Sequence, residues 1–131
     1  MPETQTKILI VEDDVTMREI IMHKLSTSGF DVVEAPDGKT AIEVWQAEKP
    51  DIVLLDLMLP ETDGFQILEK IRKDPDPKVA NASVIVLSNL FSKKDIEKAK
   101  NLSIDDFMVK AYYTTEEIFT RVKAILKKKA K

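Results

Sequence analysis

The sequence predicts an α/β fold, in which one doubly wound sheet of five parallel strands is covered by helices on both faces. Five short apolar segments alternate with amphipathic segments of helical length along the whole chain, which is the pattern of repeated strand-then-helix units. The first of these segments, residues 7–11, runs without polar alternation, as expected of a strand that is covered on both faces. Because 131 residues suit one compact core, we expect residues 1–131 to form a single domain.

The predicted strands are short segments rich in β-branched and other apolar residues. They are residues 7–11, 31–35, 51–55, 83–88 and 106–109. The segment 51–55 is the most apolar, so we expect it at the centre of the sheet. Right-handed crossovers between parallel strands leave few ways to arrange the five.

The helices between the strands are predicted from apolar residues at helical spacing. The five predicted sets of residues that share one side of a helix are Met17, Ile20, Ile21 and Leu25; Ala41, Val44, Trp45 and Glu48; Phe65, Leu68 and Ile71; Ile96 and Ala99; and Ile118, Val122, Ile125 and Leu126, of which the last set is expected to be buried. Gly29 and Pro50 end the first two helices, and residues 74–77 form a loop. Thr114 and Glu117 have the spacing of a capping box at the start of the last helix.

Composition and charge exclude several classes of protein. The formal net charge is −3, and a nucleic-acid surface is usually clustered and basic, so we expect no direct nucleic-acid binding. The basic end at 127–131 is interpreted as a solvated helix terminus. Residues 1–6 form a polar extension without a signal pattern, and no apolar run could span a bilayer. We therefore expect a cytoplasmic protein without membrane insertion. The lack of cysteine excludes disulfides, thiolate zinc sites and cysteine nucleophiles.

Polar side chains follow four of the five strands at the point where each strand ends. Along the chain they are Glu12, Asp13 and Asp14, then Asp56, then Ser88 and Asn89, and then Lys110. The carboxyl ends of parallel strands meet at one edge of the sheet, where helix N-termini favour an anion. Neighbouring carboxylates need a cation, and oxygen ligands suit Mg²⁺. The pattern predicts a metal-dependent phosphate site.

The motifs at these strand ends resemble those of the receiver domains of response regulators, and the resemblance covers nearly the whole chain. The matching segments are residues 8–14, 51–60 with 63–64, position 88 and residues 105–110. The resemblance implies a flavodoxin-like sheet with the strand order 2-1-3-4-5, counted along the chain. It also implies phosphorelay signalling, in which a sensor histidine kinase or a histidine phosphotransfer protein supplies the phosphoryl group to a switch that is not a turnover enzyme.

The resemblance also assigns a role to each residue of the metal site. It implies that Asp56 is the phosphoacceptor and that Mg²⁺ is the cofactor. Asp13 and Asp56 would bind the ion directly, the backbone carbonyl of Met58 would be a further ligand, and Glu12 would act through water. Asp14 is interpreted as a helix-start residue and not as a ligand. Phosphoryl transfer to an aspartate depends mainly on positioning and charge neutralisation, which such a site would supply.

The remaining residues carried by the resemblance belong to the switch. Ser88 would bond to the phosphoryl group, Lys110 would pair with it, and Phe107 would be the switch aromatic. The expected output surface consists of the polar helix at 92–102, the strand at 106–109 and the last helix, where an output protein or a second copy of the chain would dock.

Three residues depart from the family pattern. Residue 111 is alanine where proline is usual, so the Lys110–Ala111 peptide either stores strain in the cis form or relaxes to trans. Asn89 replaces a small residue and could crowd or polarise the water that hydrolyses an acyl phosphate. Ser103 lies where a glycine often precedes the last strand.

Three alternatives remain open. An aspartyl-nucleophile phosphohydrolase that depends on Mg²⁺ normally has a second aspartate two positions after the nucleophile, and Met58 stands there. A flavin or nucleotide binder is disfavoured because the chain has three glycines and no glycine-rich phosphate motif. The chain could also be the receiver portion of a longer DNA-binding response regulator.

Overall fold

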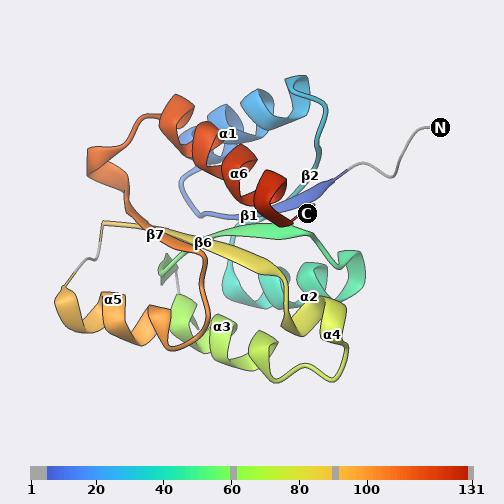
Figure 1. Cartoon of the computed structure of the whole chain (residues 1–131), viewed down its shortest axis with the longest axis vertical. Coiled ribbons are helices and arrows are strands. Elements are labelled where there is room, and N and C mark those ends of the chain that lie inside the picture. The colour runs from blue at the N-terminus through green and yellow to red at the C-terminus, as the bar shows by residue number, and fades with distance from the viewer. Residues whose placement is uncertain (1–5, 60–61, 90–91, 130–131) are drawn as a thin grey trace.

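The computed structural model describes residues 6–59, 62–89 and 92–129, and its main sheet has five parallel strands (Figure 1). The strands are β1 (Lys7–Val11), β2 (Asp31–Ala35), β3 (Ile52–Asp56), β6 (Ser83–Ser88) and β7 (Asp106–Val109). Their order is β2-β1-β3-β6-β7, and every neighbouring pair is parallel. Counted along the chain, this is the predicted order 2-1-3-4-5, so the fold class is confirmed. Most of the predicted extension at 1–6 and the last two residues of the basic end lie outside the described residues.

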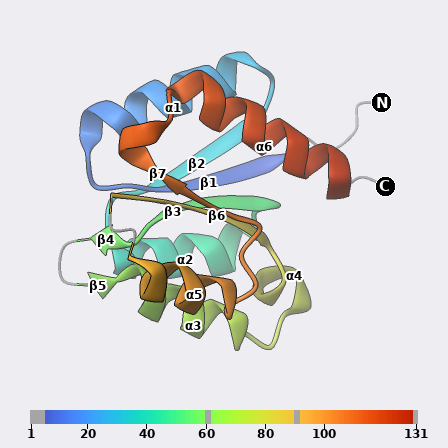
Figure 2. The same ribbon diagram turned by 60° about the vertical axis from the view of Figure 1, so that its left-hand side comes forward.

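Helices cover both faces of the sheet, as the doubly wound pattern predicts (Figures 1 and 2). One face carries α1 (Val15–Thr27) and α6 (Thr115–Lys129). The other face carries α2 (Gly38–Glu48), α3 (Gly64–Arg72), α4 (Pro77–Ala80) and α5 (Lys93–Lys100). None of the helices within the described part of the chain has the length and apolar character needed to cross a membrane.

The strands bury side chains on both faces because successive residues point to opposite sides of a sheet. In β1, Leu9 packs in the same cluster as Trp45 of α2. Its neighbours Ile8 and Ile10 pack on the opposite face with Ile21 of α1. All five side chains are at most 3% exposed, and burial of one large aliphatic side chain contributes about 1.5–3 kcal/mol. The two-sided core therefore holds the ends of the central strands firmly in place.

Side-chain caps define where two of the helices begin. At α6, the N–H of Glu117 donates to Thr114 Oγ1 at 3.1 Å and the N–H of Thr114 donates to Glu117 Oε1 at 2.8 Å, so the predicted capping box is confirmed. At α1, the N–H of Met17 donates to Asp14 Oδ1 at 3.1 Å. Asp14 is therefore the helix-start residue that the sequence predicts.

The boundaries of two elements differ from the sequence prediction. The third strand covers 52–56 and not 51–55. Asp51 immediately precedes it, and its side chain accepts a hydrogen bond from the N–H of Lys7 at 2.9 Å. The short helix α4 begins at Pro77, where a loop was expected. Proline suits the first position of a helix, and the N–H of Lys78 donates to Asp76 Oδ1 at 2.9 Å.

One apolar residue of the predicted helix stripes is exposed. Ile20 is 49% exposed, whereas Ile21 is buried. Successive helix residues point about 100° apart, so the face that buries Ile21 turns Ile20 toward solvent. Glu48 lies at the surface end of α2, where its Oε1 pairs with Lys7 Nζ at 2.6 Å.

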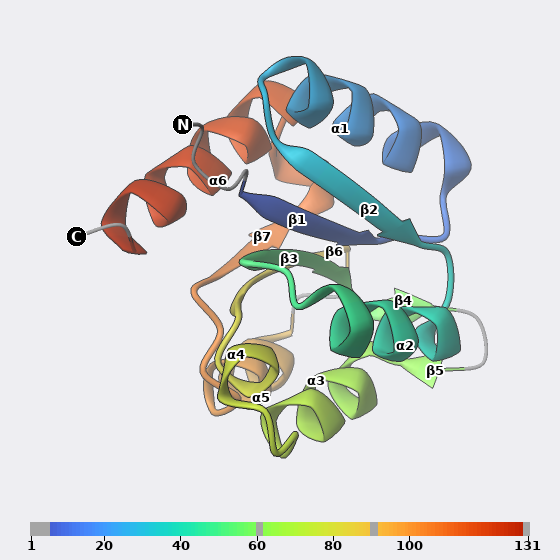
Figure 3. The ribbon, with the colours of Figure 1, turned by 90° about the vertical axis from the view of Figure 1, so that its right-hand side faces the viewer.

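A short hairpin that the sequence analysis did not predict follows β3. Its strands are β4 (Met58–Leu59) and β5 (Thr62–Asp63), and it lies beside α2 (Figure 3). The chain then passes so close to itself that a Cβ atom at Gly64 would lie 2.6 Å from Leu57 Cα and 2.8 Å from the Asp56 carbonyl oxygen. The start of α3 is therefore packed directly against the backbone that leaves β3.

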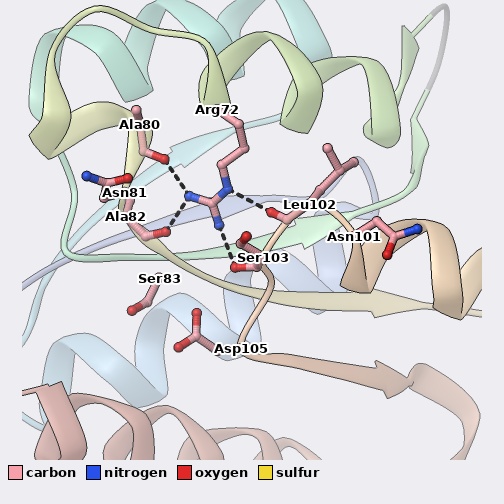
Figure 4. Close-up of a pocket in the computed structure, with 9 residues that line it drawn as sticks. All are labelled: Arg72, Ala80, Asn81, Ala82, Ser83, Asn101, Leu102, Ser103 and Asp105. Carbon is pink, nitrogen blue, oxygen red and sulfur yellow. Dashed lines mark hydrogen bonds between the residues drawn. The ribbon is translucent and has the colours of Figure 1, made fainter.

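Arg72, the last residue of α3, ties together the loops at the amino-terminal edge of the sheet (Figure 4). Its guanidinium group donates hydrogen bonds to the carbonyl oxygens of Ala80, Ala82, Leu102 and Ser103 at 2.7, 2.8, 2.9 and 3.0 Å. The same residues line a cavity of about 440 Å³. These bonds fix the loops that lead into β6 and β7.

We expect Arg72→Ala to lower the free energy of unfolding by about 2–4 kcal/mol, because four carbonyl groups, three of them in part-buried hydrogen bonds, lose a charged donor. Urea denaturation followed by circular dichroism measures the change. Lys73→Ala removes the adjacent, exposed cation and should shift the free energy by less than about 0.5 kcal/mol. A loss below about 1 kcal/mol for Arg72→Ala would contradict this role.

Candidate acidic site at the carboxyl edge of the sheet

Three carboxylates converge at the edge opposite Arg72, where the parallel strands end. Glu12 and Asp13 follow β1 directly, and Asp56 is the last residue of β3. One carboxylate oxygen from each residue lies within 4.8 Å of the others. Glu12 is 2% exposed and Asp56 is 4% exposed, whereas Asp13 is exposed to solvent. The cluster is therefore a largely buried acidic pair with one carboxylate at its solvent side.

Lys110, which follows β7, supplies the positive charge of this cluster. Its Nζ donates a hydrogen bond to Asp56 Oδ2 at 2.8 Å and lies 2.6 Å from Glu12 Oε1. Burial works against the ammonium form, but the contacts with Asp56 and Glu12 outweigh it and raise the pKa of Lys110. Burial and the nearby charge of Asp56 raise the pKa of Glu12, although the contact with Lys110 opposes them. The site therefore favours the charged form of Lys110, whereas burial works against the charged form of Glu12.

Backbone N–H groups hold the second oxygen of each buried carboxylate. The N–H of Met58 donates to Asp56 Oδ1 at 3.0 Å, and the N–H of Asp14 donates to Glu12 Oε2 at 3.1 Å. The two carboxylates are thereby oriented with their other oxygens toward Lys110. Glu12 Oε1 remains buried without a hydrogen bond, since its ion pair with Lys110 lacks hydrogen-bond angles.

This donor set fits a small divalent cation. Three carboxylates against one ammonium group leave an excess of negative charge, and one buried carboxylate oxygen still lacks a hydrogen bond. Carboxylate oxygens with an open, solvent-facing side suit Mg²⁺, which keeps several water ligands. The site can therefore accept a metal ion and, beside it, the oxygens of a phosphoryl group.

The structure brings two of the predicted switch residues, Ser88 and Lys110, to the same edge, whereas Phe107 lies further back along β7, opposite Val86. Ser88 ends β6 and is fully buried. In the ladder between β3 and β6, Asp56 lies opposite Leu87, the neighbour of Ser88. Phe107 lies half-buried on β7 and packs against the core cluster under α2 and α3. The roles of Ser88, Phe107 and the Met58 carbonyl remain predictions.

The three departures from the family pattern have structural correlates. The Lys110–Ala111 peptide is trans, as are the other peptide bonds of the described segments. Ser103 has φ = 61°, a left-handed conformation that glycine adopts more easily, which accounts for a glycine preference there. Asn89 Oδ1 accepts a hydrogen bond from the N–H of Ala111 at 3.1 Å.

The sequence analysis missed one residue that supports the site. The guanidinium group of Arg18 donates to the carbonyl oxygen of Glu12 at 2.7 Å and pairs through Nε with Glu34 at 2.6 Å. It thereby joins the loop after β1 to α1 and β2. A single arginine on the first helix has no distinctive spacing, so the sequence contains no signal for this contact.

Comparisons with known proteins agree with this arrangement. A family model described as the response regulator receiver domain matches residues 8–123. A probable transcriptional regulator ycf27 of Guillardia theta is 36% identical over 126 residues, which cover 96% of this chain and 47% of that protein. The alkaline phosphatase synthesis transcriptional regulatory protein PhoP of Bacillus subtilis (strain 168) is 33% identical, with 93% and 49% covered. The chain thus spans about half the length of these relatives.

Solved structures have the same fold. A CheY-like response regulator receiver domain protein from Methanospirillum hungatei JF-1 superposes with a TM-score of 0.86 over 95% of this chain and 96% of that chain, at 22% identity. The receiver domain of the Francisella response regulator 1452 has a TM-score of 0.82 at 33% identity, with 97% and 100% covered. Receiver domains are phosphoacceptor switches that bind Mg²⁺ at an acidic pocket and interact with histidine kinases and output domains. This chain belongs to the response regulator receiver domain family and acts in two-component phosphorelay signalling.

Proposed function

We propose that Asp56 is the residue that accepts the phosphoryl group, with Mg²⁺ as cofactor. The observation that carries the proposal is the position of Asp56, which lies at the end of the central strand within the acidic cluster and in contact with Lys110. Its solvent side, next to Asp13, is where a phosphoryl donor can approach. We further propose that the domain comprises residues 1–131 and works in the cytoplasm.

The phosphoryl group in this proposal comes from the phosphohistidine of a sensor histidine kinase or a histidine phosphotransfer protein. A carboxylate oxygen of Asp56 attacks phosphorus in line, so that a new P–O bond forms while the P–N bond breaks and its electron pair returns to the imidazole. Lys110 balances the charge on the transferring group. Bound Mg²⁺ would neutralise the phosphoryl oxygens and orient them.

The metal ligands are assigned by the same reasoning. Asp13 and Asp56 would bind Mg²⁺ directly, and Glu12, the more buried carboxylate, would act through water. The Met58 carbonyl would complete the protein ligands. Met58 is already in contact with the site, because its N–H donates to Asp56 Oδ1 at 3.0 Å. The charge balance supports this assignment, because the three carboxylates of the cluster face one ammonium group, which leaves net negative charge for a cation to neutralise.

The switch would follow from the new charge on Asp56. An acyl phosphate adds acceptor oxygens that can bond to the Ser88 hydroxyl and the Lys110 ammonium group. Movement of Ser88 would alter the space available to the Phe107 ring. The protein would then have no activity other than its own phosphorylation and dephosphorylation.

The output surface in this proposal consists of β7, which is an edge strand of the sheet, and the two helices α6 and α5, which lie on opposite faces of the sheet (Figure 2). α5 is held weakly, since Ala99 is its one buried residue. Between β7 and α6, Tyr112 is 67% exposed and Tyr113 is 37% exposed. An output protein or a second copy of the chain would dock here, so the signal would pass through protein contacts and not through direct nucleic-acid binding.

A phosphohydrolase activity is not favoured by the site. Such an enzyme needs an acid two positions after the nucleophile to protonate its leaving group. Met58 occupies that position, and its side chain is 58% exposed and cannot donate a proton.

Asp56→Asn should abolish phosphorylation while leaving the protein folded, because the amide keeps the size of the side chain but is not a nucleophile. Mass spectrometry after incubation with acetyl phosphate and Mg²⁺ measures the adduct. Asp31→Asn, at the far end of β2, is the matched control and should retain one phosphoryl group. An unchanged adduct yield in Asp56→Asn would rule out the proposed site.

Asp13→Ala should weaken Mg²⁺ binding by about tenfold or more, since one direct ligand is lost, and removal of a crowded charge should stabilise the metal-free fold slightly. Asp14→Ala is a matched control at the next position. It should leave Mg²⁺ affinity nearly unchanged but cost about 1 kcal/mol of folding free energy, because the α1 cap is lost. Isothermal titration calorimetry and urea denaturation separate the two effects. Equal Mg²⁺ affinity in Asp13→Ala and the wild type would refute the ligand assignment.

Lys110→Ala should retain some phosphorylation but lose the conformational response, because the ammonium group that follows the phosphoryl group is gone. NMR shifts of the backbone amides, with and without beryllofluoride and Mg²⁺, test this response. In the wild type the shifts should concentrate in α5, β7 and residues 110–113. Shifts restricted to α1 and α2, or a full response in Lys110→Ala, would contradict the proposed switch.

A further inference from the structure

One side-chain hydrogen bond joins the loops that leave β6 and β7. In the parallel ladder Ser88 lies opposite Val109, so the chain leaves the sheet at Asn89 on one strand and at Lys110 on the next. The side chain of Asn89 continues the ladder by one further bond, in which its Oδ1 accepts from the N–H of Ala111 at 3.1 Å. This bond therefore lies immediately beyond two residues of the candidate site.

The bond satisfies a backbone donor that has no local acceptor. Residues Lys110–Tyr112 form a 3₁₀ turn directly after β7, and the first N–H groups of such a turn have no partner within it. The residue at the cap position is Val109, whose side chain cannot accept a hydrogen bond, and no side-chain cap is present at that position. Asn89, 22 positions earlier, supplies the missing acceptor.

Lys110 is the first residue of this turn, and its side chain must reach both Glu12 Oε1 at 2.6 Å and Asp56 Oδ2 at 2.8 Å. A lysine side chain has four rotatable bonds, so the site depends on a fixed backbone at its base. We propose that Asn89 is a positioning residue for Lys110 and that it couples the loop after Ser88 to the loop after Lys110. This inference rests on the proposed function of the site.

The coupling determines how the two loops respond to a phosphoryl group. Ser88 immediately precedes Asn89, so a movement of the Ser88 backbone toward Asp56 displaces the acceptor of the Ala111 N–H. The base of Lys110 then moves with it. The Ser88 hydroxyl and the Lys110 ammonium group thereby reach the phosphoryl oxygens together. The two loops therefore change conformation in one step.

The contact is tested first in the metal-free protein by amide hydrogen exchange at Ala111, measured by NMR. Asn89→Leu keeps the approximate size of the side chain but removes its acceptor, and it should speed exchange at Ala111 about three- to tenfold, as the loss of one hydrogen bond predicts. Asn89→Asp keeps an acceptor oxygen and should restore the wild-type rate. Unchanged exchange in Asn89→Leu, or no recovery in Asn89→Asp, overturns the inference.

The positioning role is tested by the affinity for beryllofluoride in the presence of Mg²⁺. Asn89→Ala should weaken beryllofluoride binding about three- to tenfold, by the same reasoning, and leave the affinity for Mg²⁺ alone unchanged. In the Lys110→Ala background, Asn89→Ala should not weaken beryllofluoride binding further, because Asn89 acts through Lys110. Asn101→Ala, which removes an exposed asparagine after α5, is the matched control and should bind like the wild type.

The outcomes of this comparison separate the two proposals. Equal losses from Asn89→Ala in the wild-type and Lys110→Ala backgrounds, or a parallel loss of Mg²⁺ affinity, overturn the positioning role and leave the function of Asp56 intact. A wild-type protein that binds no beryllofluoride contradicts the proposed function itself.

Discussion

The contact of one ammonium group with two buried carboxylates sets the main constraint on this structure. Lys110 Nζ lies within 2.8 Å of oxygens from both Asp56 and Glu12. Breaking such a buried pair typically costs about 3–5 kcal/mol, because a buried charge is left uncompensated. The three residues come from the ends of β1, β3 and β7, so the sheet must hold these ends at fixed distances. The core on both faces of the sheet and the Arg72 hydrogen bonds at its far edge meet that requirement.

The fold was predictable because its central strands are buried on both faces and therefore appear in the sequence as continuous apolar runs. The errors have a common physical origin. A correct prediction for Ile20 would have required the rotation of α1 about its own axis. That rotation is determined only by the packing of α1 against the sheet. The hairpin at 58–63 and the short helix at Pro77 are set by local backbone contacts, such as the cap at Asp76, that periodicity does not record.

The candidate site was predictable for a different reason. Glu12, Asp13, Asp56 and Lys110 each follow a strand, and parallel topology alone brings them to one edge. Contacts between two loops leave no comparable pattern in the sequence. The bond from Ala111 to Asn89 depends on the register of β6 against β7, and the bonds of Arg72 depend on where α3 ends. Two departures from the family pattern, at positions 89 and 111, are adjacent in space, which their separation in the sequence conceals.

The close packing at Gly64 makes the surroundings of Asp56 unequally stiff. On that side the backbone after Asp56 leaves no room even for a methyl group, since a Cβ atom would lie 2.6 Å from Leu57 Cα. On the other side, within the described residues, the loops after β6 and β7 are linked by the side-chain hydrogen bond between the exposed residues Asn89 and Ala111. A group added at Asp56 therefore meets closely packed backbone on the Gly64 side, which cannot move aside easily. On the side of Asn89 and Ala111 it meets exposed loops that can move more easily. This difference in stiffness determines the direction in which a conformational change spreads from the site, before any partner is bound.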